Sequence, residues 1–186
     1  MTNQRFKPLS ADEMSPEQRR LADSILAGPR KSLGGPFSVF LYSPATGDAA
    51  QRLGAQVRFH NVLPEKLKEL AILIVARHWT AQYEWYAHHR FALEAGLRPA
   101  VAADIAAGKR PAGLQPDEQA IYDFAGELLE TKEVSDTTFK AVAQRFGEQA
   151  VVDLICTMGY YSLVSMTLNV NRFPIPQDAT PLKKLK

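Results

Sequence analysis

Hydrophobic positions recur along most of this chain with helical spacing, and the alternation typical of strands is weak. Between residues 64 and 78, Leu67, Leu70 and Ile74 are spaced i, i+3, i+7, and the neighbouring face is equally apolar. A helix that is hydrophobic nearly all round is buried in the core of a protein. Glu69 lies within this helix, so we expect its carboxylate either at the mouth of a pocket or paired inside it.

Caps and prolines divide the chain into about seven or eight helices. Ser15-Pro16 and Ser43-Pro44 each combine a capping residue with a proline at the first helical position. Residues 36–42 are either a strand or a single helical turn by pattern alone. The expected helices are 16–27, 44 to about 61, 64–78, 82–94, 99 to about 108, 116 to about 131, 135 or 136 to 146, and about 148 to 170.

The predicted fold class is therefore all-α, a bundle of helices joined by short connections. A chain of 186 residues has the usual length of one domain, so we expect a single domain over residues 1–186. Residues 1–8 and 177–186 are expected to be flexible tails, and lysines 183, 184 and 186 a solvated end.

The composition indicates which kinds of partner, and which cellular compartment, to expect for this protein. The 22 basic and 20 acidic residues are spread along the chain, so no patch for nucleic acid is evident. The one cysteine, Cys156, cannot form a disulfide within the chain or a Cys-x-x-Cys pair. The first residues lack the apolar core of a signal peptide, so a cytoplasmic protein is expected.

Residues 151–170 are apolar enough to be read as a membrane span, since this 20-residue stretch carries only one charge, Asp153. Gly159 and several Ser, Thr and Asn residues interrupt it. Such small and polar positions are more typical of a central buried helix, packed closely or shared between subunits. We therefore expect no membrane partner.

Glu84 and His88 are the strongest candidates for chemistry. They lie four residues apart, so a helix places both on one face. A carboxylate raises the pKa of a neighbouring imidazole and burial lowers it, and such opposing effects can poise a group for proton transfer. The pair could instead be an exposed ion pair, but the aromatic residues Trp85, Tyr86 and Phe91 around it argue against this.

A metal centre is disfavoured by spacing. Di-iron bundles use Glu-x-x-His on two helices, whereas here Glu-x-x-x-His occurs once and His-Glu-x-x-His is absent. His60 and His78 could in principle join a site, although His78 also fits a half-buried core position. His89 is expected to face away from His88, because adjacent residues on a helix do not share a face. No cofactor is expected.

Arg58 and Arg77 are the cations best placed for an anionic substrate, because each lies on a helix that otherwise looks buried. Each could equally form a salt bridge between helices. Tyr83 and Tyr161 are possible hydroxyl donors, although aromatic packing explains either. Cys156 has no cation nearby in the sequence, so we expect an inert buried thiol.

The same residues carry a resemblance to a known family. The stretch from Leu67 to Leu97 resembles the carboxymuconolactone decarboxylase family, of the superfamily shared with the alkylhydroperoxidase D proteins. It contains Lys68-Glu69-Leu70 and Tyr83-Glu84-Trp85-Tyr86-Ala87-His88, and the likeness extends to the Gly34-Gly35-Pro36-Phe37 loop, Ala76-Arg77-His78-Trp79, and the stretch from Gly159-Tyr160-Tyr161 to Asn169. The resemblance implies an all-α, alkylhydroperoxidase D-like fold, intertwined in a homo-oligomer, a trimer or hexamer.

The resemblance also implies a site, with one departure. Glu69 and His88 match the glutamate and histidine of the peroxidase branch, but its two cysteine positions fall on Ala81 and Glu84. A thiol peroxidase is disfavoured because its nucleophile is a thiolate. A glutamate at the second position is similar to the decarboxylase branch, which implies acid–base chemistry.

The expected function is therefore that of a cofactor-free enzyme, a lyase or isomerase of the carboxymuconolactone decarboxylase type. Its substrate would be a small carboxylated lactone or a related intermediate of aromatic compound degradation. His88, Glu84 and Glu69 would be catalytic, and Arg58, Arg77, Tyr83 and Tyr161 would bind substrate. The alternative is a non-catalytic member that binds a small acid or serves as a scaffold.

Overall fold

The computed structural model describes residues 3–185, and all regular structure in that part of the chain is helical. This confirms the all-α class. The described residues form nine α-helices, one more than the upper expectation, because residues 36–42 resolve into a short helix and not a strand. The helices are α1 (Pro16–Ala27), α2 (Pro36–Phe40), α3 (Pro44–Phe59), α4 (Glu65–His78), α5 (Gln82–Glu94), α6 (Pro99–Ala106), α7 (Pro116–Thr131), α8 (Asp136–Phe146) and α9 (Glu148–Asn171), after a 3-10 turn at Ala11–Glu13.

Local signals in the sequence explain where the helices begin. The Ser15 hydroxyl accepts a hydrogen bond from the Gln18 amide, and the Gln18 side chain accepts one from the Ser15 amide. This reciprocal capping satisfies backbone N–H groups that the first turn of α1 leaves unpaired. Ser135 caps α8 through the Thr138 amide. Pro44, Pro99 and Pro116 occupy the first position of their helices.

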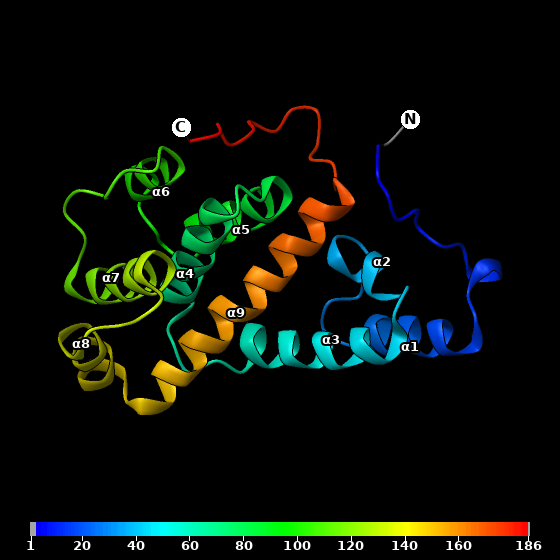
Figure 1. The fold of residues 1–186 in the computed structure, drawn as a ribbon, viewed down its shortest axis with the longest axis horizontal. Helices are drawn as coiled ribbons and strands as arrows, with labels where there is room; N and C mark the ends of the chain where they lie inside the picture. The colour runs from blue at the N-terminus through cyan, green and yellow to red at the C-terminus, as the bar shows by residue number, and fades with distance from the viewer. Residues whose placement is uncertain (1–2, 186) are drawn as a thin grey trace.

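Helix α9 is the axis around which the other helices are arranged. It crosses the molecule diagonally, with α1–α3 on one side and α4–α8 on the other (Figure 1). It packs against α4, α8, α3, α2 and α5. Helix α4 fills the space between α5, α7 and α9, and Leu70, Ile72 and Leu73 are completely buried there. The apolar character predicted for the 64–78 helix therefore reflects its position in the core.

Helix α9 has one buried and one exposed apolar face. By length and composition it could cross a membrane, and half of its most apolar stretch is buried in the structure. The exposed face carries Val152, Ile155, Leu163, Met166 and Val170, and 58% of the Val152 surface is open. Successive residues of this set are three or four positions apart, except that Gly159 takes the place between Ile155 and Leu163. They therefore lie along one side of the helix and form a stripe, which we call the α9 stripe.

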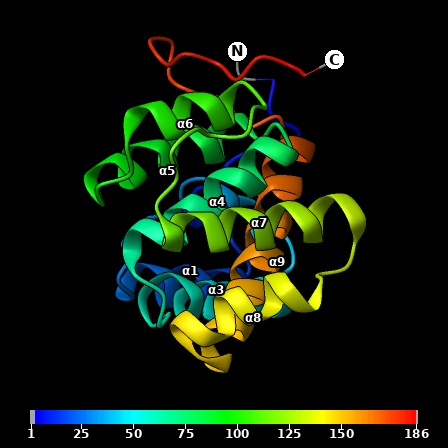
Figure 2. The ribbon, with the colours of Figure 1, turned by 90° about the vertical axis from the view of Figure 1, so that its left-hand side faces the viewer.

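The described parts of both chain ends contact the helices, and their flexibility stays a prediction. The Arg5 amide donates to the Asn171 carbonyl, and the Tyr42 hydroxyl donates to the Lys7 carbonyl. After α9 the chain returns over α5 and α6, where Leu182 and the side chain of Gln82 exchange two hydrogen bonds (Figure 2). Residues 1, 2 and 186 lie outside the described residues.

A tight turn joins α4 to α5 and determines which of their residues meet. Thr80 adopts a positive φ of 49°, and Ala81 precedes the first residue of α5. The two helices pack against each other as neighbours. Residues at similar distances from the turn therefore face one another, and this brings Glu69 on α4 opposite His88 on α5.

Candidate active site

The imidazole of His88 lies between two carboxylates. Its Nδ1 is 2.7 Å from Oε2 of Glu69, and its Nε2 is 3.0 Å from Oε1 of Glu84. All three side chains are buried, with 8% of His88 exposed and none of Glu69. The Glu84–His88 pair predicted from the sequence is therefore formed, and Glu69 pairs inside the core, on the other ring nitrogen of the same histidine.

The carboxylates favour the charged form of His88. Burial alone would lower its pKa, but the charge of Glu84, the hydrogen bonds with Glu69 and Glu84, and the charge of Glu69 outweigh it. Together they raise the pKa of His88 from 6.5 to about 9. At neutral pH the ring is thus an imidazolium, and each N–H faces a carboxylate oxygen. A group with this charge can give a proton to a substrate.

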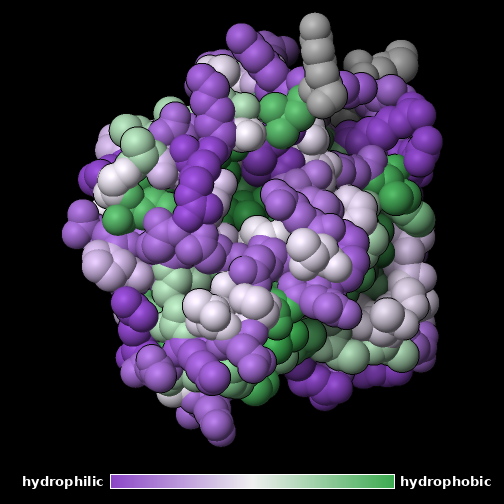
Figure 3. Space-filling view, turned by 60° about the vertical axis from the view of Figure 1, so that its left-hand side comes forward, coloured by the Kyte–Doolittle hydropathy of each residue, from purple (hydrophilic) through white to green (hydrophobic). Residues whose placement is uncertain are grey.

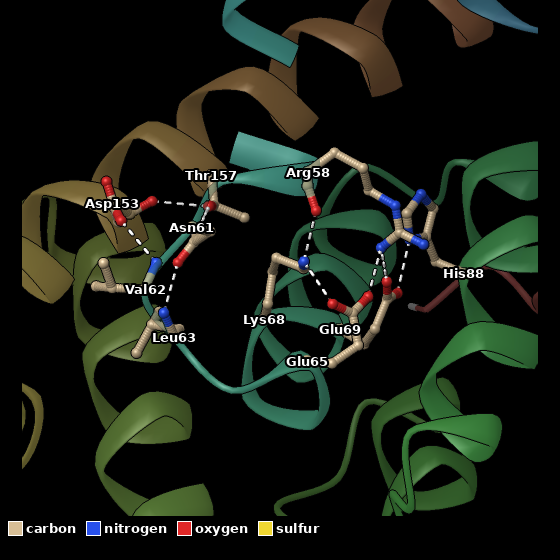
Figure 4. A network of polar contacts seen from close by, with 10 residues as sticks. All are labelled: Arg58, Asn61, Val62, Leu63, Glu65, Lys68, Glu69, His88, Asp153 and Thr157. Carbon is tan, nitrogen blue, oxygen red and sulfur yellow. Dashed lines mark hydrogen bonds and ion pairs between the residues drawn. The ribbon is translucent and has the colours of Figure 1, made fainter. Parts of the chain in front are cut away.

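Arg58 holds the other oxygen of Glu69. Its Nη1 pairs with Glu69 Oε1 and lies 3.0 Å from Glu65 Oε1 (Figure 4). Burial opposes a charge on Glu69, but its hydrogen bond and charge interaction with His88 and those with Arg58 prevail, so its pKa is lowered. Lys68 completes the network, donating to Glu65 Oε2 and to the Arg58 carbonyl, each at 2.6 Å.

Aromatic rings enclose the charged groups. The Tyr161 ring meets the His88 ring edge to face at 4.8 Å, and the Arg58 guanidinium lies 4.8 Å from the centre of the Phe91 ring. Burial and the charge of Glu84 raise the pKa of Tyr161 well above its usual value, so its hydroxyl stays protonated. These rings cover part of the charged groups, and electrostatic interactions gain strength where the surroundings are apolar.

A cavity of about 450 Å³ opens onto this site, a volume suited to a small organic ligand. Glu84, His88, Arg58 and Tyr161 line it, whereas Glu69 lies behind His88 and is not part of the wall. Glu84 and His88 can therefore touch a bound molecule, and Glu69 acts on it only through His88. The sequence predicted all three as catalytic residues and did not separate these positions.

Arg30 and Tyr160 also line the cavity, and sequence reasoning missed both. Arg30 donates from Nη1 to the Gln51 carbonyl at 3.3 Å and packs over the rings of Phe37 and Phe59. Within the described residues it forms no ion pair. In contrast to Arg58, it has a charge that no carboxylate offsets. The only signal for Arg30 in the sequence is its place in the Gly- and Pro-rich segment before α2.

Tyr160 is held beside Arg30 by a close approach of α3 and α9. A Cβ at Gly54 would overlap the Tyr160 ring and Arg30 Nη2. Only glycine leaves room for these side chains. The buried Tyr160 hydroxyl has no hydrogen-bond partner in the described structure, and burial raises its pKa to about 12.

The Gly34-Gly35 loop forms part of the rim of the cavity. Gly35 adopts φ +63°, and a Cβ there would lie 3.1 Å from the Tyr83 ring. Tyr83 also lines the larger cavity described below, so its side chain stands between two cavities. Its predicted role as a hydroxyl donor stays a prediction.

Arg77 lies apart from His88. It lines the larger cavity and not the one beside His88, and its guanidinium contacts Thr80 and two backbone carbonyls. The structure therefore brings together six of the seven predicted site residues, since Tyr83 lines the His88 cavity and Glu69 supports it. Arg77 is the exception.

Other predictions for single residues can be compared with the structure. His89 faces away from His88, as expected, and stacks on Trp85 at 5.8 Å. Cys156 is half-buried at the edge of the core, which is more exposed than predicted. Residues 3–185 contain no group of three or more His, Cys, Asp or Glu side chains arranged to hold a metal ion.

Together, the fold and the site define an all-α protein with a buried imidazolium between two carboxylates. Beside it lies a small cavity lined by an arginine that forms no ion pair within residues 3–185. This arrangement is suited to proton transfer on a small anion. Residues 44–127 match the model of the carboxymuconolactone decarboxylase family, which confirms the resemblance over this segment. Among curated proteins no significant match is found.

The family match covers only part of the site. It includes Arg58, Glu69, Glu84 and His88, the charged groups around the imidazole. Arg30, Tyr160 and Tyr161 lie outside the matched segment. The acid–base groups are therefore a feature of the matched segment, whereas residues before and after this segment complete the lining of the cavity.

Proposed function

We propose that this protein is a cofactor-free acid–base enzyme that decarboxylates a small carboxylated lactone, such as γ-carboxymuconolactone. The observation that carries the proposal is the His88 imidazolium, held by Glu69 and Glu84 at 2.7 and 3.0 Å beside a cavity. A group with a pKa near 9 is protonated at neutral pH and is ready to act as an acid.

The proposed reaction needs one proton delivered to carbon. The bond between the ring carbon and its carboxylate breaks, CO2 leaves, and the electron pair spreads into the unsaturated lactone. The carbon then takes a proton, so the sum is loss of CO2 and gain of one proton. Glu84 lines the cavity beside His88 Nε2, so the proton passes from the imidazolium to the substrate directly or through the Glu84 carboxyl.

Arg30 is the proposed anchor for the substrate. An ion pair with the departing carboxylate would stabilise the substrate more than the transition state, because that charge is lost during the reaction. Arg30 is therefore better matched to a second carboxylate, or to the lactone oxygen on which charge develops. Arg58 already pairs with Glu65 and Glu69, so its main role is to hold Glu69.

We also propose that the protein works as a homo-oligomer, joined through the α9 stripe. The exposed apolar residues of α9 lie on one face of the helix at spacings typical of helix packing. Contiguous apolar patches on a soluble protein are typical of protein interfaces. The proposal is independent of the chemistry at His88.

The experiment is to mix purified protein with γ-carboxymuconolactone and to measure CO2 release and the change in ultraviolet absorbance. His88→Gln and Glu84→Gln remove the two groups proposed to move the proton. His89→Gln and Glu94→Gln are matched controls on the same helix, since His89 stacks on Trp85 outside the cavity and Glu94 is exposed. We expect turnover in the wild type and in both controls, and a fall of about 10²-fold or more in each site variant.

Two results would contradict the proposal. If the folded wild type releases no CO2 from this or related carboxylated lactones, the reaction is wrong. If His88→Gln retains wild-type turnover, the acid is a different group. Circular dichroism on every variant separates loss of chemistry from loss of fold.

A further inference from the structure

The larger cavity of the molecule lies on the other side of Tyr83 from the His88 site. It has a volume of about 880 Å³ and is formed by the end of α4, the start of α5, α6, α7, the end of α9 and the returning C-terminal segment. Figure 3 shows the α6–α7 side of the molecule, where hydrophobic surface is recessed between hydrophilic side chains. A cavity of this size can hold a ligand larger than a single ring.

The charged groups around this cavity are mostly positive. Arg77, Lys109, Arg172 and Lys184 line it, and Glu130 is the one acidic side chain among its described lining residues. His78 lines it too, and burial together with the nearby charge of Lys132 lowers its pKa despite Glu130, so it adds no charge at neutral pH. The cavity thus has a net positive charge.

Arg77 is the most informative of these cations, because it is buried without a counter-charge. Only 6% of its surface is exposed, and it forms no ion pair within the described residues. Its Nη1 donates to the carbonyls of Ala106 and Lys183, and its Nη2 donates to the Thr80 hydroxyl. Carbonyl and hydroxyl partners satisfy N–H groups but leave the positive charge uncompensated, which is costly in a buried position.

Polar groups without partners lie beside Arg77. The Nε of Arg77 and the indole Nε1 of Trp79 are buried and make no hydrogen bond in the described structure. Both residues line the cavity. Buried donors are nearly always paired in folded proteins, so these two donors are exceptions, and both belong to residues of the cavity wall.

The remaining wall is apolar and aromatic. Phe173, Tyr122 and the side chains of Ile74, Leu129 and Leu168 line the cavity together with Trp79. Apolar walls with a few polar groups at fixed places are typical of sites for organic ligands. An inorganic anion would use the cations and leave this surface uncovered.

We propose that this cavity is a second binding site, for an organic anion that combines an apolar chain or ring with a carboxylate or phosphate group. Arg77 and the cations at the rim hold the anionic group, and the aromatic wall covers the apolar part. The guanidinium fork accepts either a carboxylate or a phosphate, so the test below distinguishes them. The proposal does not depend on decarboxylation at His88.

Trp79 provides a reporter for this site. The chain has two tryptophans, and Trp85 lines neither cavity. In a Trp85→Phe background the fluorescence therefore comes from Trp79 alone. The probes are octanoate, octyl phosphate and the uncharged 1-octanol, which share one chain length and do not absorb at the excitation wavelength of tryptophan.

We expect saturable changes in Trp79 fluorescence with octanoate, octyl phosphate or both, at least tenfold weaker binding of 1-octanol, and weaker binding at high salt. Adding Arg30→Gln should leave these affinities unchanged, which separates this cavity from the His88 cavity.

The double variant Lys109→Gln/Lys184→Gln should weaken binding roughly fivefold or more. The control Lys7→Gln/Lys140→Gln removes the same charge from positions outside the cavity and should have no effect.

The two lysines of the test variant make no side-chain hydrogen bond or ion pair in residues 3–185, so their loss should not unfold the protein. The proposal is overturned if neither anion gives a saturable signal, or if 1-octanol binds as tightly as the anions. It is equally overturned if the Lys109→Gln/Lys184→Gln variant binds the anions with wild-type affinity.

Discussion

His88 Nδ1 lies 2.7 Å from Glu69 Oε2, although the two residues are 19 positions apart and on different helices. The contact joins the buried helix α4 to the cavity wall on α5. Because Glu69 also pairs with Arg58, three helices contribute to one charged group of side chains. The stability of the fold and the protonation of His88 are therefore linked.

The first prediction concerns stability against pH. The pKa of His88 is raised from 6.5 to about 9 in the folded protein, so its contribution to stability is complete below pH 6.5 and is lost as pH rises towards 9. The shift corresponds to about 3 kcal/mol of unfolding free energy. Denaturant unfolding between pH 6 and 10 should show this fall in the wild type and a much smaller one in His88→Gln. Equal slopes for the two proteins would contradict it.

The second prediction is that Glu69 contributes a pH dependence of stability opposite in sign to that of His88. Its pKa is lowered below 4.5, so its contribution is present above pH 4.5 and is lost as pH falls through the folded value. Glu69→Gln should therefore flatten the loss of stability on the acid side. It removes one of the two carboxylate partners of Arg58 and of His88, and Glu65 and Glu84 remain, so we expect a cost of about 1–3 kcal/mol at pH 7. Urea unfolding at pH 3–7 measures both effects, with the exposed Glu94→Gln as control, and a cost below about 1 kcal/mol would argue against a charged network.

The next prediction concerns Arg30. Arg30→Gln should lower kcat/KM for a carboxylated lactone by about 10–100-fold, because a charge-assisted hydrogen bond to substrate contributes about 1.5–3 kcal/mol. The loss falls on KM if Arg30 holds the second carboxylate, and on kcat if it faces the lactone oxygen. Arg52→Gln is the control, since Arg52 is exposed on α3 and pairs only with Asp48. Steady-state kinetics on the folded variants measure the effect. An unchanged kcat/KM in Arg30→Gln would remove Arg30 from the site.

Two glycines should respond in opposite ways to alanine. Gly54→Ala should destabilise the protein by about 1–3 kcal/mol, because the new methyl group would overlap Tyr160 and Arg30. Gly126→Ala, within α7, places its methyl group in open space and should stabilise the helix by roughly 0.5–1 kcal/mol. Thermal unfolding of both variants checks the signs. A neutral Gly54→Ala would show that α3 and α9 can separate at little cost.

The α9 stripe gives a prediction about assembly. Ile155→Lys and Met166→Lys place a charge in the proposed interface and should shift the protein towards monomer in analytical ultracentrifugation. Phe139→Lys is the matched control, because Phe139 is similarly exposed but lies on α8. A wild-type protein that is already monomeric, or an assembly that tolerates both lysines, would place the interface elsewhere or remove it.

Local signals were sufficient to predict most of the fold. Ser15-Pro16, Pro116 and Ser135 each begin a helix at the predicted residue. The Glu84–His88 contact also follows from local geometry, because it lies within one helix. Such features depend on residues that are close together in the sequence, so the sequence alone predicts them.

Contacts between elements could not be predicted in the same way. Arg77 lies eight residues beyond Glu69 on the same helix, about 12 Å further along its axis, so it reaches a different cavity. Arg30 lies in a loop, where no periodicity shows which way a side chain points. The pairing of Glu69 with His88 depends on how α4 and α5 pack after the turn at Thr80.

The most direct test of the central claim, that His88 is a charged acid between Glu69 and Glu84, is its titration by nuclear magnetic resonance. The protein has four histidines, and comparison with His88→Gln assigns the signal. We expect the His88 ring to titrate with a pKa of about 9, and at a markedly lower pH in Glu69→Gln. A His88 pKa at or below 6.5 in the wild type would contradict the claim, because the imidazole would then be neutral at pH 7 and unable to supply the proton.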